Sequence, residues 1–114
     1  MTAVLTLGET LCTTHYVTRA PEAVAAFLER YPFLIPLLTE ALGPLTEAFG
    51  TATPLVVAVE TDPEVVGWVE LRVDVETTLP ADEADRRLEA FDTAWWLDNL
   101  PRAEDKLFFT LAFV

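Results

Sequence analysis

The sequence predicts an α+β fold, either a ferredoxin-like or another split β-α-β sandwich, with an antiparallel sheet and helices on one face. Three observations predict it. Segments with strand and helix patterns follow one another in the order strand, helices, strand, strand, helix, strand. Residues 68–76 alternate between apolar and mainly charged side chains, as in a strand with one buried and one wet face. Apolar residues recur at helical spacing in the segments between the strands.

The N-terminal region has the composition of β-structure. Val4–Leu7 and Leu11–Val17 are rich in β-branched and apolar residues, and Gly8 and Glu9 between them suit a two-residue turn. The pattern fits either one long bent strand or a hairpin. If this region lies apart from the sheet, three strands remain, and the α+β class still holds.

Two helices are expected between residues 21 and 49. The first begins at Pro21, a favourable residue for a first helical turn, and ends before Pro32. The second covers residues 33–49, where the apolar periodicity continues up to a glycine stop. Gly43 and Pro44 are poor helix formers, so we expect them to kink or split the second helix.

The second half of the chain repeats the alternation of strand and helix. Its expected elements are a strand over 55–60, a turn at 61–64, a strand over 68–76, a helix from Pro80 that closes at 99–105, and a last strand over 107–114. The apolar stripe of the helix consists of Ala84, Leu88, Phe91 and Trp95. The last strand is almost wholly apolar, so we expect it inside the sheet or under a partner.

Length and charge restrict the function. The 114 residues suit a single domain, residues 1–114, and 52% of them are hydrophobic. A formal net charge of -12 opposes binding to phosphate backbones, so nucleic acid is a poor partner. The most apolar stretch, residues 33–38, is too short to span a membrane, and no leader pattern is visible, so we expect a cytoplasmic protein.

Missing residue types exclude several enzyme mechanisms. The chain has no serine for a Ser-His-Asp triad and no P-loop, and its single cysteine cannot form an internal disulfide. Cys12 and His15 are too few for a structural zinc site, so we expect no metal and no cofactor. If the protein were an enzyme, Asp92, Asp98, Arg102 and His15 would be the polar residues to test. The scarcity of Asn, Gln, Cys and Met fits either heat adaptation or a GC-rich genome.

Acidic residues share one face of the helix that begins at Pro80. Their spacings of three and four place them together: Asp82, Asp85, Glu89 and Asp92. Arg86 is in position to pair with Asp82, and Arg87 with Glu83. This face is either a solvated, ion-paired surface or an acidic docking strip for a basic partner.

The tryptophan doublet lies near the end of the same helix. Trp95 continues the apolar stripe and should face the sheet, whereas Trp96 is rotated by about 100° toward the rim. Tryptophan and arginine dominate binding hot spots, so this region is a candidate interaction site. The candidate partner-binding residues are Trp96, Asp98, Arg102, Asp85, Glu89 and Asp92.

The C-terminal segment carries a recognisable pattern. Residues 91–98 read Phe-Asp-Thr-Ala-Trp-Trp-Leu-Asp, and they are followed by Pro101-Arg102 and Lys106-Leu107. With residues 31–38 and 61–64, this pattern resembles a family of small uncharacterised bacterial proteins over roughly residues 27–114. The resemblance implies no established reaction, cofactor or catalytic residue. Thr93 and Ala94 stand where that pattern has acidic residues.

These features favour a non-enzymatic, acidic protein-interaction module. Its partner would be a basic protein, as for an accessory or antitoxin-like protein, or a second copy of the chain. We expect a homodimer or heteromer because adjacent Phe108 and Phe109 give both faces of the last strand a large aromatic residue. The alternative is a small-molecule-sensing domain that binds its ligand on the open sheet face or at a dimer interface.

Overall fold

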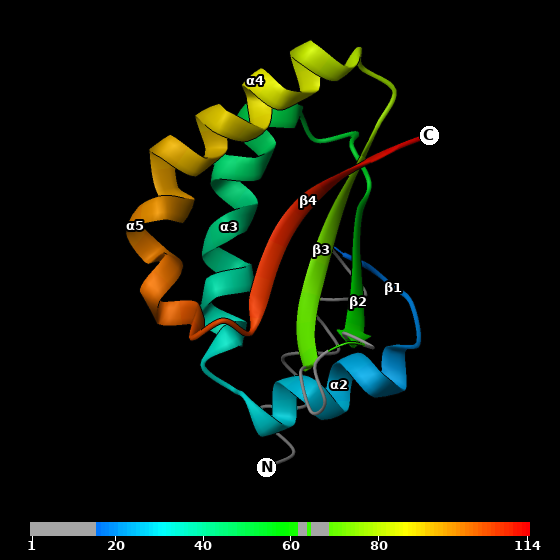
Figure 1. The fold of residues 1–114 in the computed structure, drawn as a ribbon, viewed down its shortest axis with the longest axis vertical. Helices are drawn as coiled ribbons and strands as arrows, with labels where there is room; N and C mark the ends of the chain where they lie inside the picture. Colours follow the sequence, from blue (N-terminus) through cyan, green and yellow to red (C-terminus); the bar gives the residue numbers. More distant parts are fainter. Residues whose placement is uncertain (1–15, 62–63, 65–68) are drawn as a thin grey trace.

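The computed structural model describes residues 16–61, 64 and 69–114, which form an α+β fold with a mixed sheet (Figure 1). Its strands are β1 (Val17–Thr18), β2 (Leu55–Thr61), β3 (Val69–Thr77) and β4 (Leu107–Phe113). They lie side by side in chain order, β1-β2-β3-β4. The expected strand at residues 4–7 and most of the one at residues 11–17 lie outside the described residues.

The mixed pairing corrects the expectation of an antiparallel sheet. Among the described strands, only β2 and β3 are antiparallel; β1 pairs parallel with β2, and β3 pairs parallel with β4. The helical connections carry the chain back to its starting end, so the next strand runs parallel to the last. Each connection places that strand beside its predecessor, whereas a ferredoxin-like fold inserts a strand between them. The ferredoxin-like order is therefore not confirmed.

Two helices join β1 to β2: α2 (Pro21–Arg30) and α3 (Leu34–Phe49). Pro44 lies inside α3 and does not split it, so the expectation of a split was wrong. Buried residues before and after Pro44, among them Ala41 and Leu45, hold both halves of α3 against the sheet. Packing of this apolar face outweighs the lost backbone hydrogen bond.

The connection from β3 to β4 is one helical segment that changes geometry three times. It consists of α4 (Ala81–Phe91), a π-helical turn η1 (Asp92–Trp96), a short α5 (Leu97–Asn99) and a 3-10 turn η2 (Leu100–Ala103). The predicted helix from Pro80 is thus present, and its end lies within the predicted range. Glu104 and Asp105 both have positive φ, and the chain turns there into β4.

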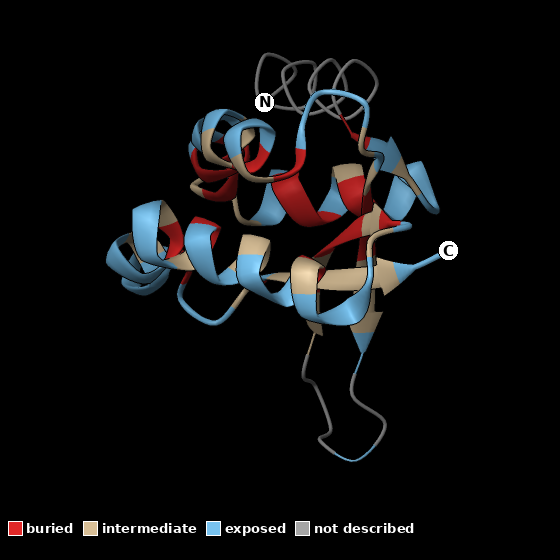
Figure 2. Ribbon diagram, turned by 90° about the horizontal axis from the view of Figure 1, so that it is seen from above, coloured by how far each residue is buried: buried red, intermediate tan, exposed pale blue. Residues whose placement is uncertain are grey.

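The two faces of the sheet differ in the way that the alternation predicted. On β3, Leu71, Val73 and Val75 are buried against the helices, whereas Glu70, Arg72 and Glu76 are half-buried on the opposite face. Asp74 is the exception, because it is buried although it belongs to the charged face. Figure 2 shows the buried residues concentrated between the helices and the sheet.

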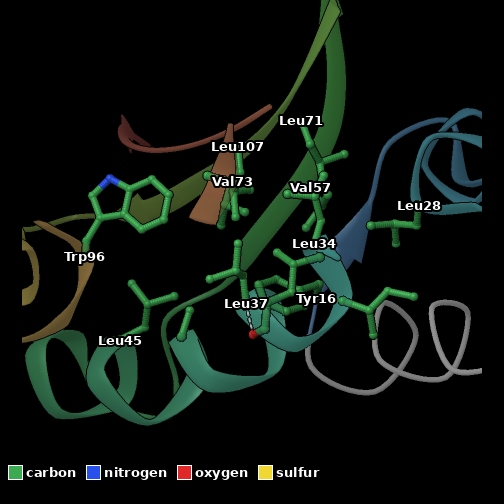
Figure 3. Packing of buried hydrophobic residues seen from close by; sticks show 14 of the residues in the cluster. Tyr16, Leu28, Leu34, Leu37, Leu45, Val57, Leu71, Val73, Trp96 and Leu107 are labelled. Atoms are coloured by element: carbon green, nitrogen blue, oxygen red, sulfur yellow. Dashed lines mark hydrogen bonds between the residues drawn. The ribbon is translucent and has the colours of Figure 1, made fainter. Parts of the chain in front are cut away.

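One hydrophobic core joins the helices to the sheet (Figure 3). Leu34 and Leu37 of α3 pack toward Val57 of β2, and Trp96 closes the end of the core nearest β4. The Tyr16 hydroxyl donates a hydrogen bond of 2.7 Å to the Leu38 carbonyl oxygen, which ties the start of β1 to α3. The helical segment from α4 to η2, which connects β3 to β4, therefore forms a layer that packs on this core.

Candidate functional site

The tryptophan doublet is arranged in the reverse of the predicted way. Trp96 is 6% exposed and belongs to the core, whereas Trp95 is half-buried at its edge. The Trp96 ring meets the Phe109 ring edge-on with centroids 4.8 Å apart and stacks on Trp95 at 5.9 Å. Trp96 therefore cannot serve as an exposed anchor, and the prediction that it lies at the rim was wrong.

The π-helical turn explains this reversal. In an α-helix, residues five apart such as Phe91 and Trp96 would differ by about 140° around the axis. In η1 the Leu97 N–H bonds to the Asp92 carbonyl oxygen, five residues earlier, so the turn holds one extra residue. Phe91 and Trp96 consequently face the same core, and every residue after Trp96 is rotated relative to α4.

Two arginines mark the side of this helical layer that faces α3. Arg87 Nη1 donates to the Ala48 carbonyl oxygen at 3.1 Å. Arg102 forms two hydrogen bonds with the Glu40 carboxylate, at 3.0 and 2.9 Å, and one with Asn99 Oδ1 at 2.8 Å. Arg102 was predicted as a partner-binding residue, but its guanidinium already holds η2 to α3.

The opposite side of the layer gathers the other candidate residues. Asp85 and Glu89 each lie two positions from Arg87, or about 200° around α4, and therefore face away from α3. Leu97, five positions before Arg102, also turns away from α3, and Leu100 is exposed at the start of η2. We call this surface the outer flank, and its residues are Asp85, Glu89, Asp92, Leu97 and Leu100.

The outer flank combines exposed apolar groups with uncompensated acid. Leu97 is 58% exposed and Leu100 is 42% exposed, so two large apolar side chains three residues apart reach solvent on this layer. Among the described residues, neither Asp85 nor Glu89 has an ion-pair partner. Partial burial and the nearby charge of Glu89 raise the pKa of the Asp92 carboxyl above its ordinary value. A cation placed here would relieve that repulsion.

The ion pairs of α4 differ in part from the predicted ones. Glu83 binds both Arg86 and Arg87, so the expected Arg87 pair is present while Arg86 pairs with Glu83 instead of Asp82. These hydrogen bonds from the two guanidinium groups lower the pKa of the Glu83 carboxyl. Both arginines are thus engaged with a residue outside the outer flank. The flank keeps its negative charge.

Asp98 is exposed on α5 and, within the described part of the chain, has no ion pair. It lies beside Leu97 and adds a further negative charge at the end of the outer flank. The sequence pointed to the acidic residues here and to the segment after the tryptophan doublet that contains Leu97 and Leu100, but it did not single out these two leucines as contact residues. The signal for both leucines depends on the π-helical turn, because an unbroken α-helix would place them elsewhere.

Arg72, on the open face of the sheet, is already paired with two acids. Arg72 Nη1 lies 2.6 Å from Glu60 Oε1, and its Nε lies 2.9 Å from Asp74 Oδ1 without hydrogen-bond alignment. Arg72 Nη2 also donates to Asp74 Oδ2 at 3.3 Å. Glu70 and Glu76 on the same face have no ion pair among the described residues, so the face is acidic and Arg72 is not free to bind an anionic ligand.

A concavity lies where α3 ends and the chain turns toward β2. Its volume is about 500 Å³, and none of its lining residues is ionisable. Those residues include Gly43, Thr46, Phe49 and Thr53. The Thr53 hydroxyl donates to the Phe49 carbonyl oxygen at 2.7 Å, so this hydroxyl is already used in ending the helix. The concavity offers shape but few unused polar groups.

The described residues contain neither a cluster of metal ligands nor a membrane-spanning helix. Within residues 16–61, 64 and 69–114, no three acidic, histidine or cysteine side chains are grouped as metal ligands would be. Over the same residues, no helix has the length and apolar character needed to cross a bilayer. Cys12 and His15, considered above as ligands or catalytic groups, lie outside the described residues.

The chain matches none of the family models, curated proteins or solved structures with which we compared it. The resemblance to the small bacterial family stays an expectation. Function is therefore inferred from the chain's own surface, on which the outer flank is the place where the predicted acidic strip meets exposed apolar residues.

Proposed function

We propose that this protein is a non-enzymatic interaction module that binds a basic protein partner on the outer flank. The single observation that carries the proposal is the exposure of Leu97 and Leu100 on the same helical layer as the acids Asp85, Glu89 and Asp92. Apolar contact supplies binding free energy, and the surrounding charge selects and steers a cationic partner. The chain's net charge of -12 extends the same attraction over longer distances.

The layer that carries the outer flank is held in place from behind. Arg87 and Arg102 fix it to α3, and Trp96 fixes it to the core beside β4. A surface that is rigid before binding loses little conformational entropy on association. The arginines thus support the flank without adding positive charge to it.

A small-molecule-sensing function is the alternative, and it has weaker support. On the open sheet face, Arg72 is neutralised by Glu60 and Asp74. The concavity at the end of α3 contains no ionisable group to fix a ligand's orientation. A compound that raises the melting temperature of the purified protein, and does so less after Gly43→Phe, would favour this alternative.

The proposal is tested with a defined basic peptide. The probe is a fluorescent, end-capped peptide of seven residues, the length of β4, in which lysine and valine alternate. The test variant is Asp85→Asn/Glu89→Gln/Asp92→Asn. The matched control, Glu22→Gln/Glu29→Gln/Glu47→Gln, removes the same number of charges from exposed sites on α2 and α3. Binding is measured by fluorescence polarisation at low and moderate salt.

We expect the test variant to bind about tenfold more weakly than the wild type, since three surface charge pairs contribute on the order of 1.5 kcal/mol together. Leu97→Asn should weaken binding severalfold, and the control should bind within about twofold of the wild type. An equal loss of peptide affinity in the two triple variants would show that the peptide is attracted by net charge alone, and would contradict a specific site on the outer flank. No binding at low salt would also contradict the proposal.

A further inference from the structure

The edge of the sheet formed by β4 has unused backbone hydrogen-bonding groups. The Leu71 N–H donates to the Lys106 carbonyl oxygen at 2.8 Å, and the Val114 N–H donates to the Thr77 carbonyl oxygen at 3.1 Å. In this parallel register, the even-numbered residues of β4 turn their N–H and C=O groups toward β3. The odd-numbered residues turn theirs outward: Leu107, Phe109, Leu111 and Phe113. Among the described residues, no strand pairs with this outward edge.

β4 lacks the features by which proteins protect an exposed edge. The strand reads Leu-Phe-Phe-Thr-Leu-Ala-Phe, with no charged residue, no proline and no glycine. Its register with β3 is continuous from Leu107 to Phe113, so no bulge interrupts it. Phe108 is 38% exposed and Phe113 is 55% exposed. A regular, uncharged and partly exposed edge strand is suited to accept another strand.

The outer flank lies over the same edge. α4 and η1 pack on β4 through Phe91 and Trp96, whose rings lie 5.0 and 4.8 Å from the Phe109 ring, measured between centroids. The outer flank is the side of this layer that faces away from α3. Since β4 is the last strand of the sheet, that side projects toward the space beyond it. Asp85 and Asp92 lie about 120° and 100° round the helix from Phe91, which packs on β4, so a strand added to β4 would carry alternate side chains toward these two acids.

We infer that the partner binds by adding an extended segment to β4 as an antiparallel strand. Basic side chains of the segment would face the outer flank, and apolar ones would pack beside Phe108 and Ala112 on the open face. This inference rests on the proposed function, because it specifies how the basic partner docks. A second copy of the chain is a poorer occupant, since its own Asp85 and Asp92 would approach the same two acids of this chain.

Backbone methylation of the lysine-valine peptide separates strand addition from charge attraction. In an antiparallel pair, the hydrogen-bonded residues on the two strands point to the same face. The outward groups of β4 belong to Phe109, Leu111 and their odd-numbered neighbours, whose side chains face the helices. The peptide residues that hydrogen-bond to β4 therefore also point toward the helices, and these residues are the lysines, because the lysines are placed to face the outer flank. N-methylation of the lysines should weaken binding at least tenfold, and N-methylation of the valines should leave it nearly unchanged.

A pair of variants tests the same edge from the protein side. Phe113→Pro removes one outward N–H and keeps every bond to β3, whereas Phe113→Ala removes the same side chain and keeps the N–H. Phe113→Pro should bind the peptide about three- to tenfold more weakly than Phe113→Ala. Circular dichroism and melting temperature confirm that both variants fold.

The outcomes distinguish this inference from the proposed function. If both methylated peptides bind like the parent, and the two Phe113 variants agree, strand addition is wrong while binding on the outer flank stands. If only methylation of the valines weakens binding, the added strand is parallel, and the antiparallel assignment is overturned. If the parent peptide does not bind, both proposals fail. Sedimentation showing a dimer that the peptide dissociates would assign the edge to a second copy and contradict the inference.

Discussion

The reversed tryptophan doublet yields the sharpest stability prediction. Trp96 is almost fully buried and contacts the rings of Trp95 and Phe109, so Trp96→Ala removes a core side chain and leaves a cavity. Core truncations of this size destabilise proteins by about 3–5 kcal/mol. For a domain of roughly 100 residues, that loss lowers the melting temperature by about 12–20 °C.

Trp95→Ala is the matched comparison. Trp95 is half-buried at the edge of the core, so its removal should cost about 1–2 kcal/mol. Urea unfolding of the wild type and both variants, followed by circular dichroism at 222 nm, a standard helix band, gives the free energies of unfolding. Equal losses, or a larger loss for Trp95→Ala, would refute the burial assigned to η1.

Three further predictions concern η1 and the charge of the chain. Deleting Ala94 should convert the π-helical turn to an α-helical one and keep Phe91 and Trp96 on the core face, so the free energy of unfolding should change by less than about 1 kcal/mol. Deleting Glu89 inside α4 instead rotates Phe91 away from the core and should cost more than about 3 kcal/mol. Thermal melting of the two deletion variants would show the difference. Asp92→Asn should stabilise the protein at neutral pH by less than about 1 kcal/mol, because the raised pKa means that the fold disfavours this carboxylate. The gain should disappear as the pH falls below the ordinary pKa of aspartate, where the residue is protonated in both the folded and unfolded states; a gain that persists in acid would contradict this cause. Moderate sodium chloride should raise the melting temperature by screening the net charge of -12, and a steady decrease would contradict that self-repulsion.

Local patterns in the sequence predicted the elements well. The alternation over residues 68–76 correctly identified which side of β3 packs on the helices, because a strand's side chains point to opposite faces in turn. Pro21 begins α2, and the apolar periodicity of residues 33–49 matches the buried face of α3. These features depend on neighbouring residues alone, so a single sequence contains them.

Features set by distant contacts were not predictable in this way. The order and direction of the strands depend on where each helical connection returns along the sheet, which no local pattern encodes. Arg102 was expected to face a partner, but its bonding to Glu40 joins residues 62 positions apart. The π-helical turn shifted Trp96, Leu97 and Leu100 together, so one unpredicted residue in a turn altered the candidate site.

Amide hydrogen exchange along β4, with and without the lysine-valine peptide, tests the central claim most directly. In the unbound protein, the N–H groups of Phe108, Thr110 and Ala112 are bonded to β3 and should exchange slowly, whereas those of Phe109 and Leu111 should exchange faster. Saturating peptide should slow exchange at Phe109 and Leu111 at least tenfold. Peptide binding that leaves these two amides unprotected would contradict strand addition at this edge.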